Sequence, residues 1–144
     1  MSAFAPVFSA KNAEKGLSLL KGKEGEKIAS DIVTIVDDPF RPDSVQSAFD
    51  GEGVATYTKK VVENGVLNTL LYNLSAAKKA GKTSTGNGNH SNGIRYHNFY
   101  IQAGDTPRDE LLKMADGGIF ITEFIDKNFR FCFFNCWFSF NNWW

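Results

Sequence analysis

The sequence predicts an α+β protein with a mixed, largely antiparallel sheet and short helices, forming an incomplete domain. Three observations predict this class. Several β-branched or aromatic segments lie between turn residues, the helical segments are short, and no strand-helix-strand rhythm repeats along the chain. With 144 residues, the chain is long enough for one domain built around one core.

The first part of the chain is expected to contain extended segments joined by turns. Residues 10–30 contain three glycines that interrupt any long helix, which predicts an extended segment with short turns. The β-branched segment Asp31–Asp37, closed by acids and a proline, predicts a strand that is buried on both faces. A short strand is predicted at Val45–Phe49, after the polar connection Arg41–Ser44 and before the turn Asp50–Gly53.

The dipeptide Asn64-Gly65 is the clearest local signal in the chain. It tolerates positive φ at both central positions of a type I′ turn, and it separates two strand-like segments, Ala55–Glu63 and Val66–Tyr72. The sequence therefore predicts a β-hairpin at this point.

A short helix and a long polar loop are expected next. Ser75 is predicted to cap the helix Ala76–Ala80, which Gly81 ends. The segment Thr83–Gly93 is too rich in Gly and Asn for regular structure, so it is predicted to be the longest loop. Alternating residues then predict a strand over Ile94–Gln102.

The last part of the chain divides into a family-like portion, 1–124, and an aberrant tail, 125–144. Thr106 and Pro107 form a helix start that predicts a helix to about Ala115, and Ile119–Phe124 is predicted to be a last strand. The tail holds nine aromatic residues in twenty positions and fits no regular pattern. A frameshift or gene-end artefact is predicted, and a genuine aromatic strand pair that docks on a partner is the alternative.

Composition narrows the class of function. Lys and Arg number 16 and Asp and Glu number 16, so no excess charge attracts nucleic acid. No signal-peptide pattern and no clean apolar span indicate secretion or membrane insertion. The two cysteines, Cys132 and Cys136, have no further Cys or nearby His to complete a disulfide framework or a zinc site. A cytoplasmic location is expected.

The candidate metal ligands and carboxylates give weak signals. His90 and His97 are the only histidines, and they lack the spacing of a zinc site, so no metal ligand is assigned. Four acids lie beside Pro or Gly and are interpreted as turn formers, with paired acid-base carboxylates as the alternative; they are Asp37, Asp38, Asp50 and Glu52. No catalytic residue is assigned.

One glycine-rich loop is the remaining candidate site. It superficially resembles a phosphate cradle, but no Lys-Ser/Thr follows and the next element is a predicted strand, so nucleotide binding is not expected. It is interpreted either as a contact loop for a peptide or partner backbone, or as plain turn chemistry. Its residues are Thr85, Gly86, Asn87, Gly88 and Asn89.

The order of several short motifs resembles the TldD/PmbA family. The motifs are Gly25–Ser30, Thr34–Pro39, Phe49–Val54, Glu63–Leu67, Ser84–Asn87 and Gly118–Glu123. The likeness covers about residues 8–124 and implies the front part of the family's C-terminal domain. Members of that family pair around an inner cavity in which a zinc peptidase cuts unfolded peptides.

The resemblance also implies which branch of the family is present. The peptidase branch carries His-Glu-x-x-x-His just upstream of the Gly25–Ser30 motif, and this chain reads Met1–Pro6 there. The resemblance therefore implies the PmbA (TldE-like) branch. A chain of this branch is expected to have no metal site of its own and to be inactive alone. Zinc is expected in a TldD-like partner subunit, self-association is the alternative pairing, and unfolded peptides are the expected substrate.

Two other functions stay open. One is a stand-alone scaffold module that binds peptides or proteins through the hairpin and the Asn/Gly loop. The other is an active metallopeptidase whose metal ligands follow no motif recognisable in the sequence.

Overall fold

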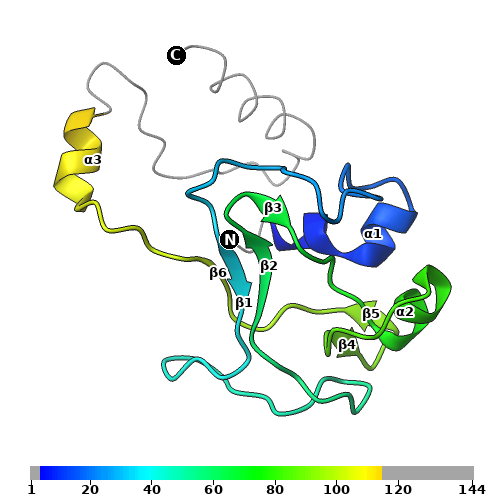
Figure 1. The fold of residues 1–144 in the computed structure, drawn as a ribbon. Helices are drawn as coiled ribbons and strands as arrows, with labels where there is room; N and C mark the ends of the chain where they lie inside the picture. The colour runs from blue at the N-terminus through cyan, green and yellow to red at the C-terminus, as the bar shows by residue number, and fades with distance from the viewer. Residues whose placement is uncertain (1–3, 115–144) are drawn as a thin grey trace. The chain divides into compact units, whose positions relative to one another are not determined.

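A four-stranded antiparallel sheet lies at the centre of the first of two compact units, residues 1–104 and 105–144. The computed structural model describes residues 4–114, and Figure 1 shows their ribbon. The strand order is β3-β2-β1-β6. Together with short helices, this sheet confirms the α+β class. The strands are β1 (Ile35–Asp37), β2 (Lys59–Glu63), β3 (Val66–Leu67) and β6 (Phe99–Ile101).

Strand β1 is the inner strand that fixes the later site. All three of its residues are buried, which confirms a strand that is buried on both faces. The strand is shorter than predicted, since it begins at Ile35 rather than at Asp31, and Ile32 before it is 89% exposed. Asp37 is the register partner of Lys59 on β2 and of Phe99 on β6. This register brings an acid and a lysine together inside the sheet.

The predicted hairpin is confirmed at Asn64-Gly65, which joins β2 to β3 (Figure 1). Asn64 has φ 48° and Gly65 has φ 79°, as a type I′ turn requires. Gly65 has a second role, because a Cβ there would lie 2.3 Å from the carbonyl oxygen of Ala29. The paired strands are shorter than predicted: β2 begins at Lys59, and β3 ends at Leu67.

The prediction of an extended segment after residue 10 is wrong at its start. The 3₁₀-helix η1 (Ala5–Phe8) and the helix α1 (Ala10–Glu14) precede Gly16, which has φ 71° and follows the helix rather than interrupting it. The three glycines of residues 10–30 all follow α1, so they do not prevent a short helix at the start of this segment. Ala10 and Ala13 are the buried residues of α1.

The helix α2 (Leu74–Ala80) is confirmed, but its cap is different. Asn73, not Ser75, is the N-cap: its side chain accepts a hydrogen bond from the N–H of Ala76 at 2.9 Å. Ser75 lies inside the first turn. Gly81 ends the helix in the left-handed conformation, as predicted.

Two sequence predictions of strands and loops are wrong in part. Residues 45–49 form no strand; Val45 is 87% exposed, and only Phe49 makes an isolated bridge, to Ala55. The glycine-rich loop contains regular structure, since β4 (Gly88–Asn89) pairs antiparallel with β5 (Gly93–Ile94). The predicted strand 94–102 is therefore divided between β5 and β6.

The second unit is described over residues 105–114. It contains the helix α3 (Arg108–Met114), close to the predicted bounds, with Asp109 and Glu110 in its first turn. The predicted strand Ile119–Phe124 and the tail 125–144 lie outside the described residues. No helix in residues 4–114 is long and apolar enough to span a membrane.

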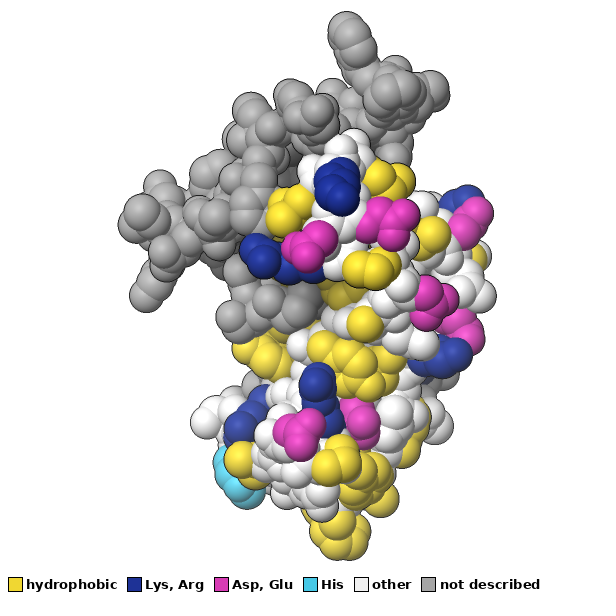
Figure 2. Space-filling model, turned by 90° about the vertical axis from the view of Figure 1, so that its left-hand side faces the viewer, with side chains coloured by type: hydrophobic (Ala, Val, Ile, Leu, Met, Phe, Trp, Pro, Cys, Tyr) yellow, Lys and Arg dark blue, Asp and Glu magenta, His cyan; other side chains and the backbone are white. Residues whose placement is uncertain are grey.

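Charges of both signs are mixed on the described surface. On the face drawn in Figure 2, basic and acidic side chains lie among hydrophobic ones rather than in a field of one sign. Ion pairs account for part of this mixing, for example Lys27 with Asp31 at 2.6 Å and Lys79 with Glu14 at 3.0 Å. This distribution matches the balanced composition.

Candidate functional site

A buried polar cluster is centred on Asp37, whose side chain is fully buried at the end of β1. Its Oδ2 accepts hydrogen bonds from Lys59 Nζ at 3.1 Å and from Asn87 Nδ2 at 2.7 Å. Its Oδ1 accepts the backbone N–H of His97 at 2.7 Å. One carboxylate therefore ties together β1, β2, the glycine-rich loop and the segment that leads to β6.

Lys59 supplies the opposite charge of this cluster. It is 6% exposed, and its ammonium also lies 4.7 Å from the ring centroid of Tyr57. Burial lowers the pKa of Lys59, and the charge of Asp37 and its hydrogen bond act in the opposite direction. A buried pair of this kind is sustained only when its remaining polar atoms are bonded, which Asn87 and His97 provide here.

Asn87 uses its entire amide inside the chain. Besides Asp37, its Nδ2 donates to the carbonyl of Arg95 at 2.8 Å, and its Oδ1 accepts from Thr85 Oγ1 at 2.7 Å. Thr85 Oγ1 in turn accepts the N–H of Tyr72 at 2.8 Å. The side chains of Thr85 and Asn87 thus act as fixed internal links.

His97 and Gly86 form another internal link. His97 Nε2 lies 2.9 Å from the carbonyl oxygen of Gly86, and because a carbonyl only accepts, Nε2 carries the proton. Gly86 has φ 68°, and a Cβ there would lie 2.7 Å from the carbonyl oxygen of Ala55. The loop is therefore packed closely against the segment before β2.

The five loop residues predicted from the sequence are brought together, but mostly inside the protein. Thr85, Gly86, Asn87 and Gly88 are buried, and Asn89 is exposed. Contact with a peptide or partner through this loop stays a prediction. Sequence reasoning missed the pairing of Asp37 with Lys59, for which the signal was an acid directly after a β-branched run.

Of the four acids interpreted as turn formers, Asp38 and Asp50 organise local backbone, whereas Asp37 bonds distant segments and is not a turn former. Asp50 Oδ1 accepts the N–H groups of Glu52 and Val54, both at 2.9 Å, which confirms it as a turn former. Asp38 Oδ1 likewise accepts the N–H of Phe40 at 3.0 Å. Glu52 differs, since its Oε2 accepts the N–H of Leu74 at 2.7 Å, at the start of α2.

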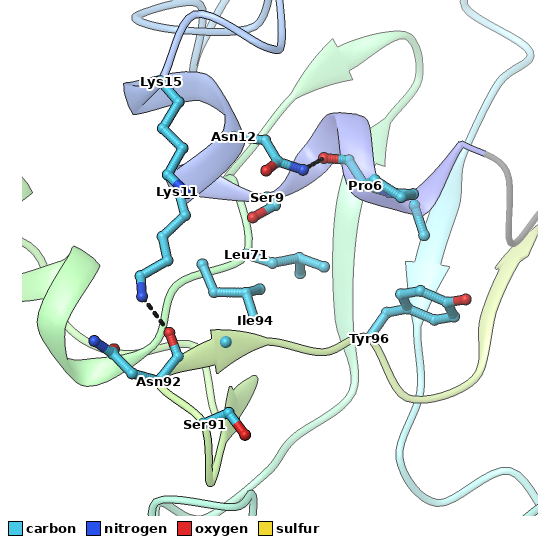
Figure 3. A pocket seen from close by; sticks show the side chains of 12 residues that line it. Pro6, Ser9, Lys11, Asn12, Lys15, Leu71, Ser91, Asn92, Ile94 and Tyr96 are labelled. Atoms are coloured by element: carbon cyan, nitrogen blue, oxygen red, sulfur yellow. Dashed lines mark hydrogen bonds between the residues drawn. The ribbon is translucent and has the colours of Figure 1, made fainter. Parts of the chain in front are cut away.

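A separate cavity of about 380 Å³ lies between α1 and the segment that contains β5. Figure 3 shows Lys11 and Lys15 along one face of α1, with the Lys11 ammonium donating to the carbonyl of Asn92 on the opposite side. Ser9 and Leu71 lie between these elements. The lining contains no acid; its members are Ala5, Pro6, Ser9, Lys11, Asn12, Lys15, Leu71, Ser91, Asn92, Gly93, Ile94 and Tyr96.

The histidines do not converge with other ligands. Within residues 4–114, no group of three or more His, Cys, Asp or Glu side chains is arranged to hold a metal ion. His97 is hydrogen-bonded to Gly86, whereas His90 is exposed.

A comparison with known proteins identifies the class of protein to which the chain belongs. A family model described as the PmbA/TldA metallopeptidase C-terminal domain matches residues 1–136. The fold is thus that of a metallopeptidase-related C-terminal domain. The chain belongs to the TldD/PmbA family.

Solved structures and curated relatives agree with this assignment. A Thermotoga maritima structure described as that of a putative modulator of a DNA gyrase has 46% identity and a TM-score of 0.75, over 81% of this chain and 27% of that chain. TldE from Thermococcus kodakarensis has 36% identity and a TM-score of 0.67, over 77% of this chain and 27% of that chain. A metalloprotease of Archaeoglobus fulgidus is 37% identical over 83% of this chain and 29% of its own length.

The chain is short beside its relatives. It spans between 20% and 29% of the lengths of the first three curated proteins that it matches. What those whole proteins do therefore reaches this chain only as a proposal.

Proposed function

We propose that this chain is the scaffold portion of a PmbA (TldE-like) subunit, which pairs with a zinc-bearing TldD-like subunit in the cleavage of unfolded peptides. In this role the chain shapes and holds the peptide site, and the partner supplies the zinc and the hydrolytic step. No catalytic or metal-binding residue is assigned to this chain. Self-association is the alternative pairing.

The observation that carries the proposal is that the buried side chains of Asp37 and Asn87 are fully hydrogen-bonded inside the chain. A general acid or base must reach the proton of a substrate, but both oxygens of Asp37 are occupied by Lys59, Asn87 and His97. The side-chain oxygen and nitrogen of Asn87 are likewise hydrogen-bonded inside the chain. These residues are suited to holding a rigid frame rather than to proton transfer.

The comparisons within one organism give a second support. Two Buchnera aphidicola relatives from the pea-aphid strain are a metalloprotease PmbA homolog, 34% identical over 127 residues, and a metalloprotease TldD homolog, 30% identical over 116 residues. The matched stretch is longer and the identity higher for the PmbA homolog. The TldE structure of Thermococcus kodakarensis, at 36% identity, points the same way.

The location and the excluded partners belong to the same proposal. A cytoplasmic setting is supported by the two cysteines, which lack partners for a disulfide framework. Nucleic acid is not expected as a partner, because the formal net charge of zero provides no excess of positive charge. No membrane partner is proposed either.

The proposal is tested by mixing the full chain with a purified TldD-like subunit of the family and an unfolded polypeptide such as reduced, alkylated casein. We expect no cleavage by the chain alone, co-elution of the two subunits in gel filtration, and chelator-sensitive cleavage by the pair. Cleavage by the chain alone, abolished by a chelator, would overturn the proposal. Peptide binding without any association would favour the stand-alone scaffold instead.

A further inference from the structure

The cavity beside α1 combines positive charge with an apolar wall. Lys11 and Lys15 are four residues apart, which places their side chains on the same face of the helix, as Figure 3 shows. Ile94, which is half-buried, lines the cavity with carbon, whereas Leu71, also in the lining, is 1% exposed and offers little surface. The cavity has no acidic lining residue to neutralise the two ammonium groups.

Hydrogen-bond donors remain available in this cavity. Lys11 has three N–H donors, and the contact with Asn92 uses one of them. No partner for Lys15 is found among residues 4–114, and Glu14 next to it is paired with Lys79. The cavity therefore presents several charged donors and no competing acceptor charge.

Ser9 adds a hydroxyl to the wall of this cavity. It is 8% exposed and lines the cavity, and its hydroxyl makes no hydrogen bond to another residue in the described part of the chain. Among the described residues no buried side-chain oxygen or nitrogen lacks a hydrogen-bond partner, so the Ser9 hydroxyl is one that solvent reaches. A ligand oxygen that enters the cavity would find this hydroxyl as a further donor.

We propose that this cavity binds the C-terminal carboxylate of a peptide whose last side chain is apolar. The two ammonium groups and the Ser9 hydroxyl would receive the carboxylate oxygens, since charge-assisted bonds of this kind are the strongest available. The last side chain would pack on Ile94. The volume of about 380 Å³ accommodates one such residue and part of its neighbour.

This site deepens the proposed function, on which it rests, by naming which part of the unfolded peptide the scaffold holds. A subunit that binds the C-terminal carboxylate of a peptide would orient the rest of that peptide toward the catalytic partner. Binding at the cavity itself needs neither zinc nor cleavage.

The test is a titration of the ¹⁵N-labelled full chain with three short peptides, followed by NMR shifts of residues 9–15 and 91–96. The first is acetyl-Ala-Ala-Leu with a free carboxyl group, the second is its C-terminal amide, and the third is acetyl-Ala-Ala-Glu amide. We expect the first to bind at least about tenfold more tightly than the other two. The third peptide separates a terminal carboxylate from a side-chain one.

Variants locate the binding. Lys11→Gln and Lys15→Gln should each weaken binding of the free-carboxyl peptide about tenfold, and Lys11→Arg should retain it. Lys21→Gln removes an exposed lysine that does not line the cavity, and it should have no effect. Circular dichroism of each variant checks that the fold is kept.

Equal binding of the acid and the amide, absence of shifts with every peptide, or an equal effect of Lys21→Gln would each overturn the carboxylate site. Any of these results would leave the proposed pairing with a TldD-like subunit intact. Conversely, zinc-dependent cleavage by the chain alone would overturn the proposed function while the carboxylate preference could still be measured. The two failures are thus distinguishable.

Discussion

Asp37 on β1 and Lys59 on β2 are register partners whose side chains form a buried ion pair, with Oδ2 and Nζ 3.1 Å apart. The carboxylate also holds Asn87 and the N–H of His97, so four segments of the chain meet at one side chain. This arrangement makes Asp37 the organising residue of the described fold.

Replacing Asp37 with Ala should strongly destabilise the protein. The change leaves a buried ammonium and two buried N–H donors without their acceptor, which typically costs about 3–5 kcal/mol. The free energy of unfolding measured in urea should fall by this amount. Glu14→Ala is the control, because it breaks an exposed pair with Lys79 and should cost less than about 1 kcal/mol.

A double replacement gives the matching test of the ion pair. Asp37→Leu combined with Lys59→Met removes both charges, so it should lose much less stability than Asp37→Ala alone. If the double variant were as unstable as the single one, the uncompensated charge of Lys59 would not be the cause.

Gly65→Ala should destabilise the hairpin more than Gly53→Ala. Both glycines have φ 79°, so both substitutions incur the left-handed penalty of about 1–2 kcal/mol. Only at Gly65 would the new Cβ meet backbone, at 2.3 Å from the carbonyl oxygen of Ala29, whereas nothing lies within 4 Å at Gly53. Thermal unfolding of the two variants measures the difference, and equal shifts would contradict the close approach.

Asn73→Ala should cost more than Ser75→Ala. Asn73 is fully buried, caps α2, and its Nδ2 donates to Asn92 Oδ1 at 2.9 Å and to the carbonyl of Gly93 at 3.2 Å. Loss of the cap and of these bonds should cost about 2 kcal/mol or more. Ser75→Ala should stay within about 0.5 kcal/mol. If denaturant unfolding showed a larger loss of stability for Ser75→Ala than for Asn73→Ala, Ser75 would be the cap.

Glu24 should make stability depend on acid pH. Burial alone would raise its pKa, but hydrogen bonds from Lys82 and the N–H of Leu70, with the charge of Lys82, hold the pKa below its ordinary value of 4.5. A carboxyl with a lowered folded pKa stabilises the protein above pH 4.5, and this contribution disappears as pH falls through the folded pKa.

Glu24→Gln measures this contribution directly. The difference in free energy of unfolding between wild type and Glu24→Gln should be largest near neutral pH and should shrink as pH drops below 4.5. Urea unfolding at several pH values gives this curve. A difference that does not change with pH would show that the ionised form of Glu24 has no special partners.

Local chemistry made part of the fold predictable. The Asn64-Gly65 turn and the Gly81 helix end depend on positive φ, which few residue types adopt, so the sequence alone indicated them. The capping residue of α2 was missed because Asn73 and Ser75 are both good caps, and burial of Asn73 against Asn92 decides between them. The prediction of a strand at residues 45–49 is wrong because the β-branched and aromatic residues there have no neighbouring strand with which to pair.

The polar cluster and the cavity depend on contacts between distant positions. Asp37 and Asn87 are 50 residues apart, and Lys11 and Asn92 are 81 apart. A single sequence shows neither pairing, because no local spacing rule connects such positions. The loop residues were recognised as unusual from their composition, but their burial follows only from the tertiary fold.

Zinc binding by the isolated chain tests the central claim most directly. The full chain, dialysed against a small excess of zinc and then desalted, is analysed for metal by mass spectrometry alongside a TldD-like subunit as the positive control. The scaffold role predicts far less than one zinc per chain, and about one in the control. One tightly bound zinc per chain, removed together with peptide cleavage by a chelator, would contradict it.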